Sequence, residues 1–208
     1  MDIATQLASA LGRRDEEPNI ELAKKVAAKN DTKATAALIE LLQNKDKNIQ
    51  SDAVKVLDEI SKINPSLTAA HSQTFLSMLS RKNNRLQWGA MAVLDNICDE
   101  IPAKMYSSLP EIMEAAEKGS VITRDHAVSI LIKLCAHDKW NEDAFRLLKE
   151  QLHHCPTNQL PMYAENCITV IKPAQKPGMV RLLTRRLPEI EKDSKRNRVA
   201  KVIKKLSA

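Results

Sequence analysis

Residues 53–60 read Ala53-Val54-Lys55-Val56-Leu57-Asp58-Glu59-Ile60, and the apolar frame of this stretch returns three more times at intervals of 37 residues. The first position of the frame is alanine in every copy: Ala53, Ala90, Ala127 and Ala164. The positions four and seven residues later are aliphatic in every copy: Leu57, Leu94, Leu131 and Ile168, then Ile60, Ile97, Leu134 and Ile171. Four copies at one spacing indicate a repeat protein, which offers an extended surface rather than a pocket.

Each repeat is expected to contain two helices, because apolar residues recur at the three-to-four-residue spacing of a helix face. The clearest pair is predicted at residues 32–44 and 48–63, and a degenerate first pair at residues 3–11 and 20–28. Proline cannot sit in a helix interior, so Pro65 and Pro102, which are also 37 residues apart, are expected to separate successive units.

This pattern predicts an all-α fold, a right-handed α-α superhelix (solenoid) of about six helical pairs. The whole chain, residues 1–208, is expected to be one domain without room for a second. Within it we expect a degenerate N-terminal cap pair at 1–30, regular repeats at 31–171 and a basic C-terminal capping repeat at 172–208.

The best-preserved unit resembles the HEAT-repeat (armadillo-like) family. The resemblance lies in Leu41-Leu42-Gln43-Asn44-Lys45-Asp46, then Ile49-Gln50, then Ala53 and Leu57. Arg124 carries the arginine of the family, and Gln50 and Gln87 occupy the same place in their units. Asn44 departs from the usual aspartate, and 37 residues is shorter than the roughly 40–47 of this family. Tetratricopeptide repeats fit less well, since Leu41 and Met78 stand where that family needs a small residue. The resemblance implies an architecture, which does not by itself carry a function.

Composition limits where the protein works. No stretch approaches the 18 or so consecutive apolar residues of a membrane span, and the first residues lack the pattern of a secretory signal. The four cysteines are expected to be free thiols in a reducing compartment. We therefore expect a cytoplasmic protein without a membrane span, and a monomer.

No group of residues predicts catalysis or metal binding. His153-His154-Cys155 places three potential ligands side by side, but adjacent helical residues point in different directions. Cys98, Cys135 and Cys167 lie on the core face or its flank, where a thiol is usually inert. We expect neither an enzyme nor a cofactor.

The second helices supply the predicted partner-binding surface, because the resemblance implies that they line the concave side. Positions two before, two after and five after the repeat alanine are expected to face away from the core. The candidates for binding a protein partner at or beside these positions are Asp58, Trp88, Asp95, Asp125, Met162 and Asn166. Trp88 and Met162 would anchor apolar groups, and the aspartates would meet basic groups. The alternative for Trp88 is packing against the next unit.

A second hypothesis concerns nucleic acid. Residues 172–208 carry twelve Lys or Arg against three acids, whereas the preceding residues carry 20 basic and 23 acidic side chains. The candidate phosphate-binding residues are Arg181, Arg185, Arg186, Arg198, Lys201, Lys204 and Lys205. Such clusters attract phosphate backbones with strongly salt-dependent affinity. The alternative is that the lysines only solvate a capping helix.

Overall fold

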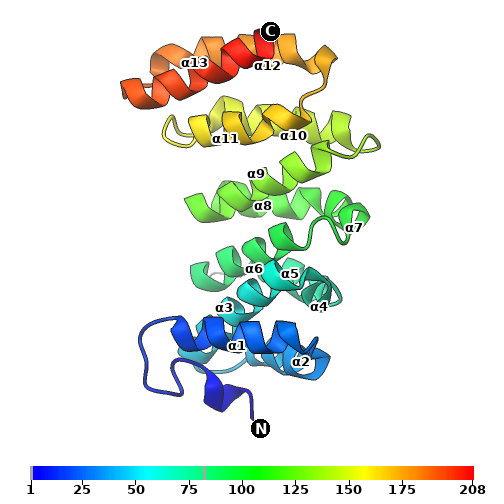
Figure 1. The fold of residues 1–208 in the computed structure, drawn as a ribbon, viewed down its shortest axis with the longest axis vertical. Helices are drawn as coiled ribbons and strands as arrows, with labels where there is room; N and C mark the ends of the chain where they lie inside the picture. The colour runs from blue at the N-terminus through cyan, green and yellow to red at the C-terminus, as the bar shows by residue number, and fades with distance from the viewer. Residues whose placement is uncertain (1, 82) are drawn as a thin grey trace. The chain divides into compact units, whose positions relative to one another are not determined.

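The computed structural model describes residues 2–81 and 83–208, and every regular element in these ranges is a helix (Figure 1). The prediction of an all-α fold is confirmed. The chain divides into two units, Met1–Ala127 and Val128–Ala208. We describe each unit by itself.

The first unit contains the two best-formed helical pairs. Its elements are the 3-10 helix η1 (Ala4–Gln6) and the helices α1 (Glu17–Ala28), α2 (Thr32–Leu41), α3 (Lys47–Ile63), α4 (Pro65–Ala69), α5 (Ser72–Met78), α6 (Asn84–Asn96), α7 (Pro102–Ser107), α8 (Leu109–Lys118) and the beginning of α9 (Val121–Cys135). α2 pairs with α3 and α5 with α6, while α1, α3 and α6 pack one along the next. The second helices therefore form a layer of their own in this unit.

Capping residues explain where these helices begin. Asp31 Oδ1 accepts a hydrogen bond from the Ala34 backbone at 2.9 Å, and Asp46 Oδ1 accepts one from Asn48 at 2.8 Å. Asn83 does the same for the start of α6. Each side chain satisfies a backbone donor that the first helical turn leaves without a partner. Asn64, which precedes α4, makes no such side-chain bond.

The repeat frame coincides with the core. All four repeat alanines have no exposed surface, and the aliphatic residues that follow at the two later frame positions are buried, except Ile168. Ile168 differs because α11 ends at Cys167 and a 3-10 turn follows. Small residues at the frame position allow the helices to approach closely. The approach is tight at Gly89, next to Ala90, where even a β-carbon would collide with Val54.

Two local predictions need correction. Residues 3–11 hold only the 3-10 helix Ala4–Gln6 and turns, so the first of the two N-terminal helices is absent and α1 stands alone. Pro65 and Pro102 do begin new segments, but each starts a short helix of its own, α4 or α7. Proline is compatible with the first helical turn because the N–H it lacks has no helical acceptor there.

The second unit contains the rest of α9 and two further pairs. Its helices are α10 (Asn141–His154), α11 (Leu160–Cys167), α12 (Lys176–Arg186) and α13 (Asp193–Ser207), with the 3-10 helices η2 (Ile168–Val170), η3 (Pro173–Gln175) and η4 (Leu187–Glu189). α12 packs on α13, α10 contacts α12 and α11 contacts α13. First and second helices thus stack on their own kind here as well.

Candidate functional site

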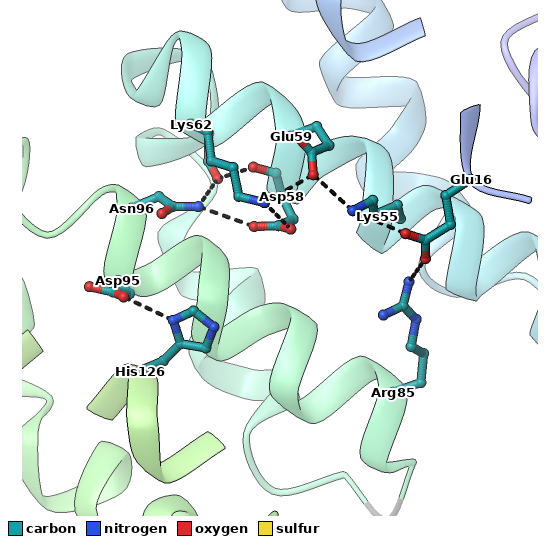
Figure 2. Close-up of polar contacts among 10 residues, drawn as sticks. Glu16, Lys55, Asp58, Glu59, Lys62, Arg85, Asp95, Asn96 and His126 are labelled. Atoms are coloured by element: carbon teal, nitrogen blue, oxygen red, sulfur yellow. Dashed lines mark hydrogen bonds and ion pairs between the residues drawn. The ribbon is translucent and has the colours of Figure 1, made fainter. Parts of the chain in front are cut away.

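The second helices of the first unit present a continuous row of polar side chains around one tryptophan. We call this row the second-helix face and define it by residues that are not fully buried: Lys55, Glu59 and Lys62 of α3, Arg85, Trp88 and Asn96 of α6, and Asp125 and His126 of α9. Glu16, which directly precedes α1, reaches the same row (Figure 2).

Trp88 is half-buried, and the side chain of Arg85 lies over its indole ring. The guanidinium carbon of Arg85 lies 4.1 Å from the centre of the indole ring. A guanidinium over an aromatic face is attracted by the electron density of the ring. The two side chains are three residues apart on α6, and this spacing places them on one side of the helix.

Ion pairs connect α3 to this tryptophan. Lys55 Nζ lies 2.8 Å from Glu59 Oε1 and 3.1 Å from Glu16 Oε2, and the other oxygen of Glu16 lies 2.7 Å from Arg85 Nη2. Lys62 Nζ contacts Glu59 at 2.9 Å and Asp58 at 2.8 Å. Figure 2 shows these contacts as one chain of alternating charges that runs along α3 and crosses to α6.

The network shifts the titration of its members. Burial alone would lower the pKa of Lys55, but hydrogen bonds to Glu59 and Glu16 and their negative charges raise it above its ordinary value. Burial would likewise raise the pKa of Glu59, yet hydrogen bonds from Lys55 and Lys62 lower it. The pKa of Lys62 is raised in the same way, against burial, by Asp58 and Glu59. All three groups are therefore held in their charged forms at neutral pH.

Asp58 and Asp95 do not lie on the exposed surface that the helical wheel predicts. Their exposed fractions are only 6% and 7%. Asp58 Oδ1 accepts a hydrogen bond from Asn96 Nδ2 at 3.1 Å, and Asp95 Oδ2 lies 2.9 Å from His126 Nδ1. For these two residues, the expectation that position five after the alanine faces solvent is wrong, because the next second helix covers each of them. Both carboxylates link successive second helices.

The other predicted partner-binding residues lie at the surface to different degrees. Asp125 is half-buried on α9, and Met162 on α11 is half-buried as well. Asn166 on α11 is exposed. The part that these three residues play in partner binding stays a prediction.

Arg186, one of the proposed phosphate ligands, is a buried structural residue. Only 7% of it is exposed. Its Nη1 donates to the backbone oxygens of Leu152 at 2.9 Å and Cys155 at 2.8 Å, and its Nε donates to Glu189. The guanidinium thus caps the carboxyl end of α10 and has little surface left for a phosphate.

The remaining basic candidates are exposed. Arg198 is engaged by Glu165 through two hydrogen bonds, of which Nε to Oε1 measures 2.8 Å, and this pairing lowers the pKa of Glu165. Within the described ranges, no ion pair involves the other five: Arg181, Arg185, Lys201, Lys204 and Lys205. These five cations are the ones that an anionic ligand could reach.

The thiols show no sign of reactivity. All four cysteines are free and buried. Burial raises the pKa of Cys135 and of Cys167 to about 12, so neither is a thiolate at neutral pH. Among the described residues, no three His, Cys, Asp or Glu side chains gather as a metal site, and no helix combines the length and apolar character needed to cross a membrane.

Sequence reasoning missed the part played by Glu16 and Arg85. Arg85 stands five residues before Ala90, one helical turn ahead of Trp88, so extending the same row by a turn would have found it. Glu16 lies outside the repeat frame, and no periodicity points to its contact across 69 residues with Arg85.

Comparison with known proteins supports the assignment of the repeat. A family model described as Sister chromatid cohesion protein PDS5 matches residues 25–173. No curated protein matches the chain in a sequence search.

Several solved structures share the fold. A designed armadillo repeat protein in complex with the peptide (KR)4 is similar with a TM-score of 0.68 and 13% identity over 90% of this chain and 86% of that one. Computationally designed armadillo repeat proteins for modular peptide recognition give 0.64 and 14% over 98% of both chains. The archaeal HEAT-like repeats protein from Thermococcus onnurineus NA1 gives 0.50 and 15% over 93% and 98%. These likenesses establish a HEAT/armadillo-type solenoid fold, and confirm the resemblance seen in the sequence.

Proposed function

The chain belongs to the family of the sister chromatid cohesion protein PDS5, and from this premise we propose that it is a non-enzymatic scaffold that binds a protein partner. The partner would dock on the second-helix face, with Trp88 at its centre. A single observation carries the proposal: a half-buried indole stands among charged side chains on helices whose own apolar faces are already packed.

The physical argument concerns preorganisation. Trp88 and Arg85 are residue types that contribute most to interface affinity, and here the stacked pair is held in place by the ion pairs of Glu16 and Lys55. A partner that covers such a fixed pair loses little side-chain entropy on binding. Two of the similar structures are designed armadillo proteins described with peptides, which supports a protein segment as the ligand.

Affinity capture from native lysate, with and without nuclease, tests the proposal. Wild type is compared with Trp88→Ala and with Trp140→Ala. Trp140→Ala is the matched control, because it removes the other tryptophan of the chain, the residue that directly precedes α10. We expect a protein that is captured by wild type and Trp140→Ala after nuclease treatment but lost with Trp88→Ala. Asp95 is unsuitable as a probe, because it is buried on His126.

Two results would count against the proposal. A loss of unfolding free energy of about 3–5 kcal/mol in Trp88→Ala, as large as that of a core Trp→Ala substitution, would mark the indole as a packing residue. Capture that requires nucleic acid and ignores Trp88→Ala would move the function to the second unit.

The exposed cations of α12 and α13 support a second candidate function, binding to nucleic acid. Arg181 and Arg185 are one turn apart on α12, as are Lys201 and Lys205 on α13. Each phosphate contact would add about 0.9 to the slope of log affinity against log salt on duplex DNA. The triple variant Lys201→Glu, Lys204→Glu, Lys205→Glu should then flatten that slope in a titration with labelled duplex. A slope near zero in the wild type would reject this candidate.

A further inference from the structure

The carboxylate of Glu16 bridges two cations that come from successive second helices. Oε2 lies 3.1 Å from Lys55 Nζ on α3, and Oε1 lies 2.7 Å from Arg85 Nη2 on α6 (Figure 2). Among the described residues, Glu16 is the one carboxylate in contact with Arg85. One carboxylate therefore pairs with two cationic side chains that lie on neighbouring helices, α3 and α6.

The two cations are better shielded than the carboxylate that they hold. The side chain of Lys55 is 15% exposed and that of Arg85 26%, whereas that of Glu16 is 49% exposed. Arg85 is additionally fixed against the ring of Trp88, and Lys55 against Glu59. The cations lie on α3 and α6, and the carboxylate reaches them from the residue that directly precedes α1.

Glu16 is delivered by a segment that lacks regular structure. Residues 11–16 are all exposed and contain no helix, and Gly12 turns the chain with a φ of +68°. The segment borders a cavity of about 520 Å³ that Arg13, Asn48, Ser51 and Arg85 also line. The backbone of Glu16 itself is fixed by α1, because its oxygen accepts a hydrogen bond from Ile20 N at 3.0 Å. Its half-exposed side chain leaves the two cations by rotation about its own bonds, which requires no unfolding of the helix.

We propose that Lys55, Arg85 and Trp88 form a binding site for a glutamate or aspartate side chain of an acidic partner segment, and that Glu16 occupies this site in the free protein. The inference rests on the proposed function and adds the chemistry of the partner. Exchange of one carboxylate for another keeps both ion pairs and the Arg85–Trp88 stack. The tethered Glu16 competes at a high effective concentration, and the partner overcomes it with its further contacts along the row.

The charges favour an acidic segment over a basic one. Arg85 already covers one face of Trp88 and supplies the cation that a basic side chain of the partner would otherwise bring to it. Asp58 and Asp95 are buried, and Glu59 is held by two lysines. A basic segment would bring its cations against Lys55, Lys62 and Arg85, and like charges placed together oppose binding.

Fluorescence anisotropy with three labelled octapeptides tests the inference on the full chain. The probes are octaglutamate, (KR)4 and a neutral glycine–serine peptide. Glu16→Gln removes the competing charge and is compared with Glu17→Gln, an exposed glutamate in the next position. We expect Glu16→Gln to bind octaglutamate about two- to five-fold more tightly than wild type, because the loss of an exposed ion pair changes an equilibrium constant by no more than about five-fold. Glu17→Gln should match the wild type.

Arg85→Gln and Lys55→Gln provide the complementary arm, and each should weaken octaglutamate binding relative to wild type. The inference is overturned if Glu16→Gln leaves octaglutamate affinity unchanged, whether or not it lowers the melting temperature, since Glu16 would then be only a structural contact. It is also overturned if (KR)4 binds more tightly than octaglutamate and Glu16→Gln weakens that binding. In either case, continued loss of the captured protein in Trp88→Ala would leave the proposed function standing.

Discussion

Gly89 shows how little space separates two second helices. A side chain at this position would place its β-carbon 2.7 Å from Cγ2 of Val54 on α3. Glycine inside a helix usually costs about 0.5–1 kcal/mol relative to alanine, so its presence in α6 needs a local reason. The close approach to Val54 supplies that reason.

The first prediction follows from this contact. Gly89→Ala gains helix propensity but overpacks the crossing, at a cost of about 1–3 kcal/mol, so we expect a net loss of unfolding free energy in urea titration. In combination with Val54→Ala the clash disappears, and the two substitutions should couple by about 1 kcal/mol in a double-mutant cycle. A variant as stable as wild type, or more stable, would show that α3 yields without strain.

At the residue scale the sequence predicts the core better than the surface. The frame alanines and, except for Ile168, their aliphatic partners are buried as the periodicity requires, because each of these residues faces its own partner helix. Asp58 and Asp95 escape the argument, since a wheel drawn for one helix does not contain the neighbouring helix that covers them. Trp88 and Asp125 are correctly placed away from the core but are only half-exposed.

At the scale of the helical pair, three equivalent residues perform one task. Gln50, Gln87 and Arg124 stand three residues before a repeat alanine. Each donates a hydrogen bond to a backbone oxygen at or just beyond the carboxyl end of the preceding first helix: Asn44 at 2.6 Å, Leu79 at 2.7 Å and Ala116 at 3.3 Å. The last carbonyl groups of a helix receive no hydrogen bond from within the helix, so a donor from elsewhere is needed. In the fourth repeat, the residue three positions before Ala164 is Pro161, whose side chain has no hydrogen-bond donor.

The absence of a donor at position 161 explains why Arg186 is buried at the end of α10. The end of α10 receives the Arg186 guanidinium instead, through the oxygens of Leu152 and Cys155. The sequence groups Arg186 with the other basic residues of α12, because the density of charge can be counted along the chain. Its contact with the end of α10, 31 and 34 residues away, cannot be inferred from that count. The neighbouring Arg185 remains exposed.

The second prediction concerns the pH dependence of α3. The pKa of Glu59 is lowered in the folded protein, so its ion pairs contribute stability above the unfolded pKa of about 4.3 and lose it as the pH falls through the lower folded value. Lys55 and Lys62 have raised pKa values, so their contribution is complete below about pH 10 and is lost only at higher pH. The network is therefore fully formed throughout the neutral range.

Glu59→Gln should accordingly lower the unfolding free energy at neutral pH by about 0.5–1 kcal/mol, and the difference from wild type should shrink towards zero below about pH 4. Urea titrations followed by circular dichroism at both pH values measure this. Glu40→Gln on α2 serves as the control, because Glu40 is exposed and has no ion pair within the described part of the chain. A difference that persists undiminished in acid would assign the effect of Glu59 to packing rather than charge.

At the scale of the whole molecule, a repeat protein is stabilised by each repeat and by its contacts with the next one, so destabilisation need not spread along the chain. The cysteines sample both units: Cys98 belongs to the first, and Cys155 and Cys167 to the second. All three are at most 2% exposed, so each thiol reacts with an alkylating reagent only when its surroundings open. Labelling of each thiol therefore measures the opening of its own region.

The third prediction uses Arg186→Met to separate the two regions. The substitution removes the guanidinium donor from the carbonyls of Leu152 and Cys155, which should cost about 2–4 kcal/mol. In urea-dependent pulse alkylation read by mass spectrometry, the midpoints for Cys155 and Cys167 should fall, while that for Cys98 should stay at its wild-type value. Arg185→Gln, the exposed neighbour, should move none of them. Equal shifts for all three thiols would instead show that the chain unfolds as one cooperative body, and no shift at all would mean that the Arg186 cap contributes little.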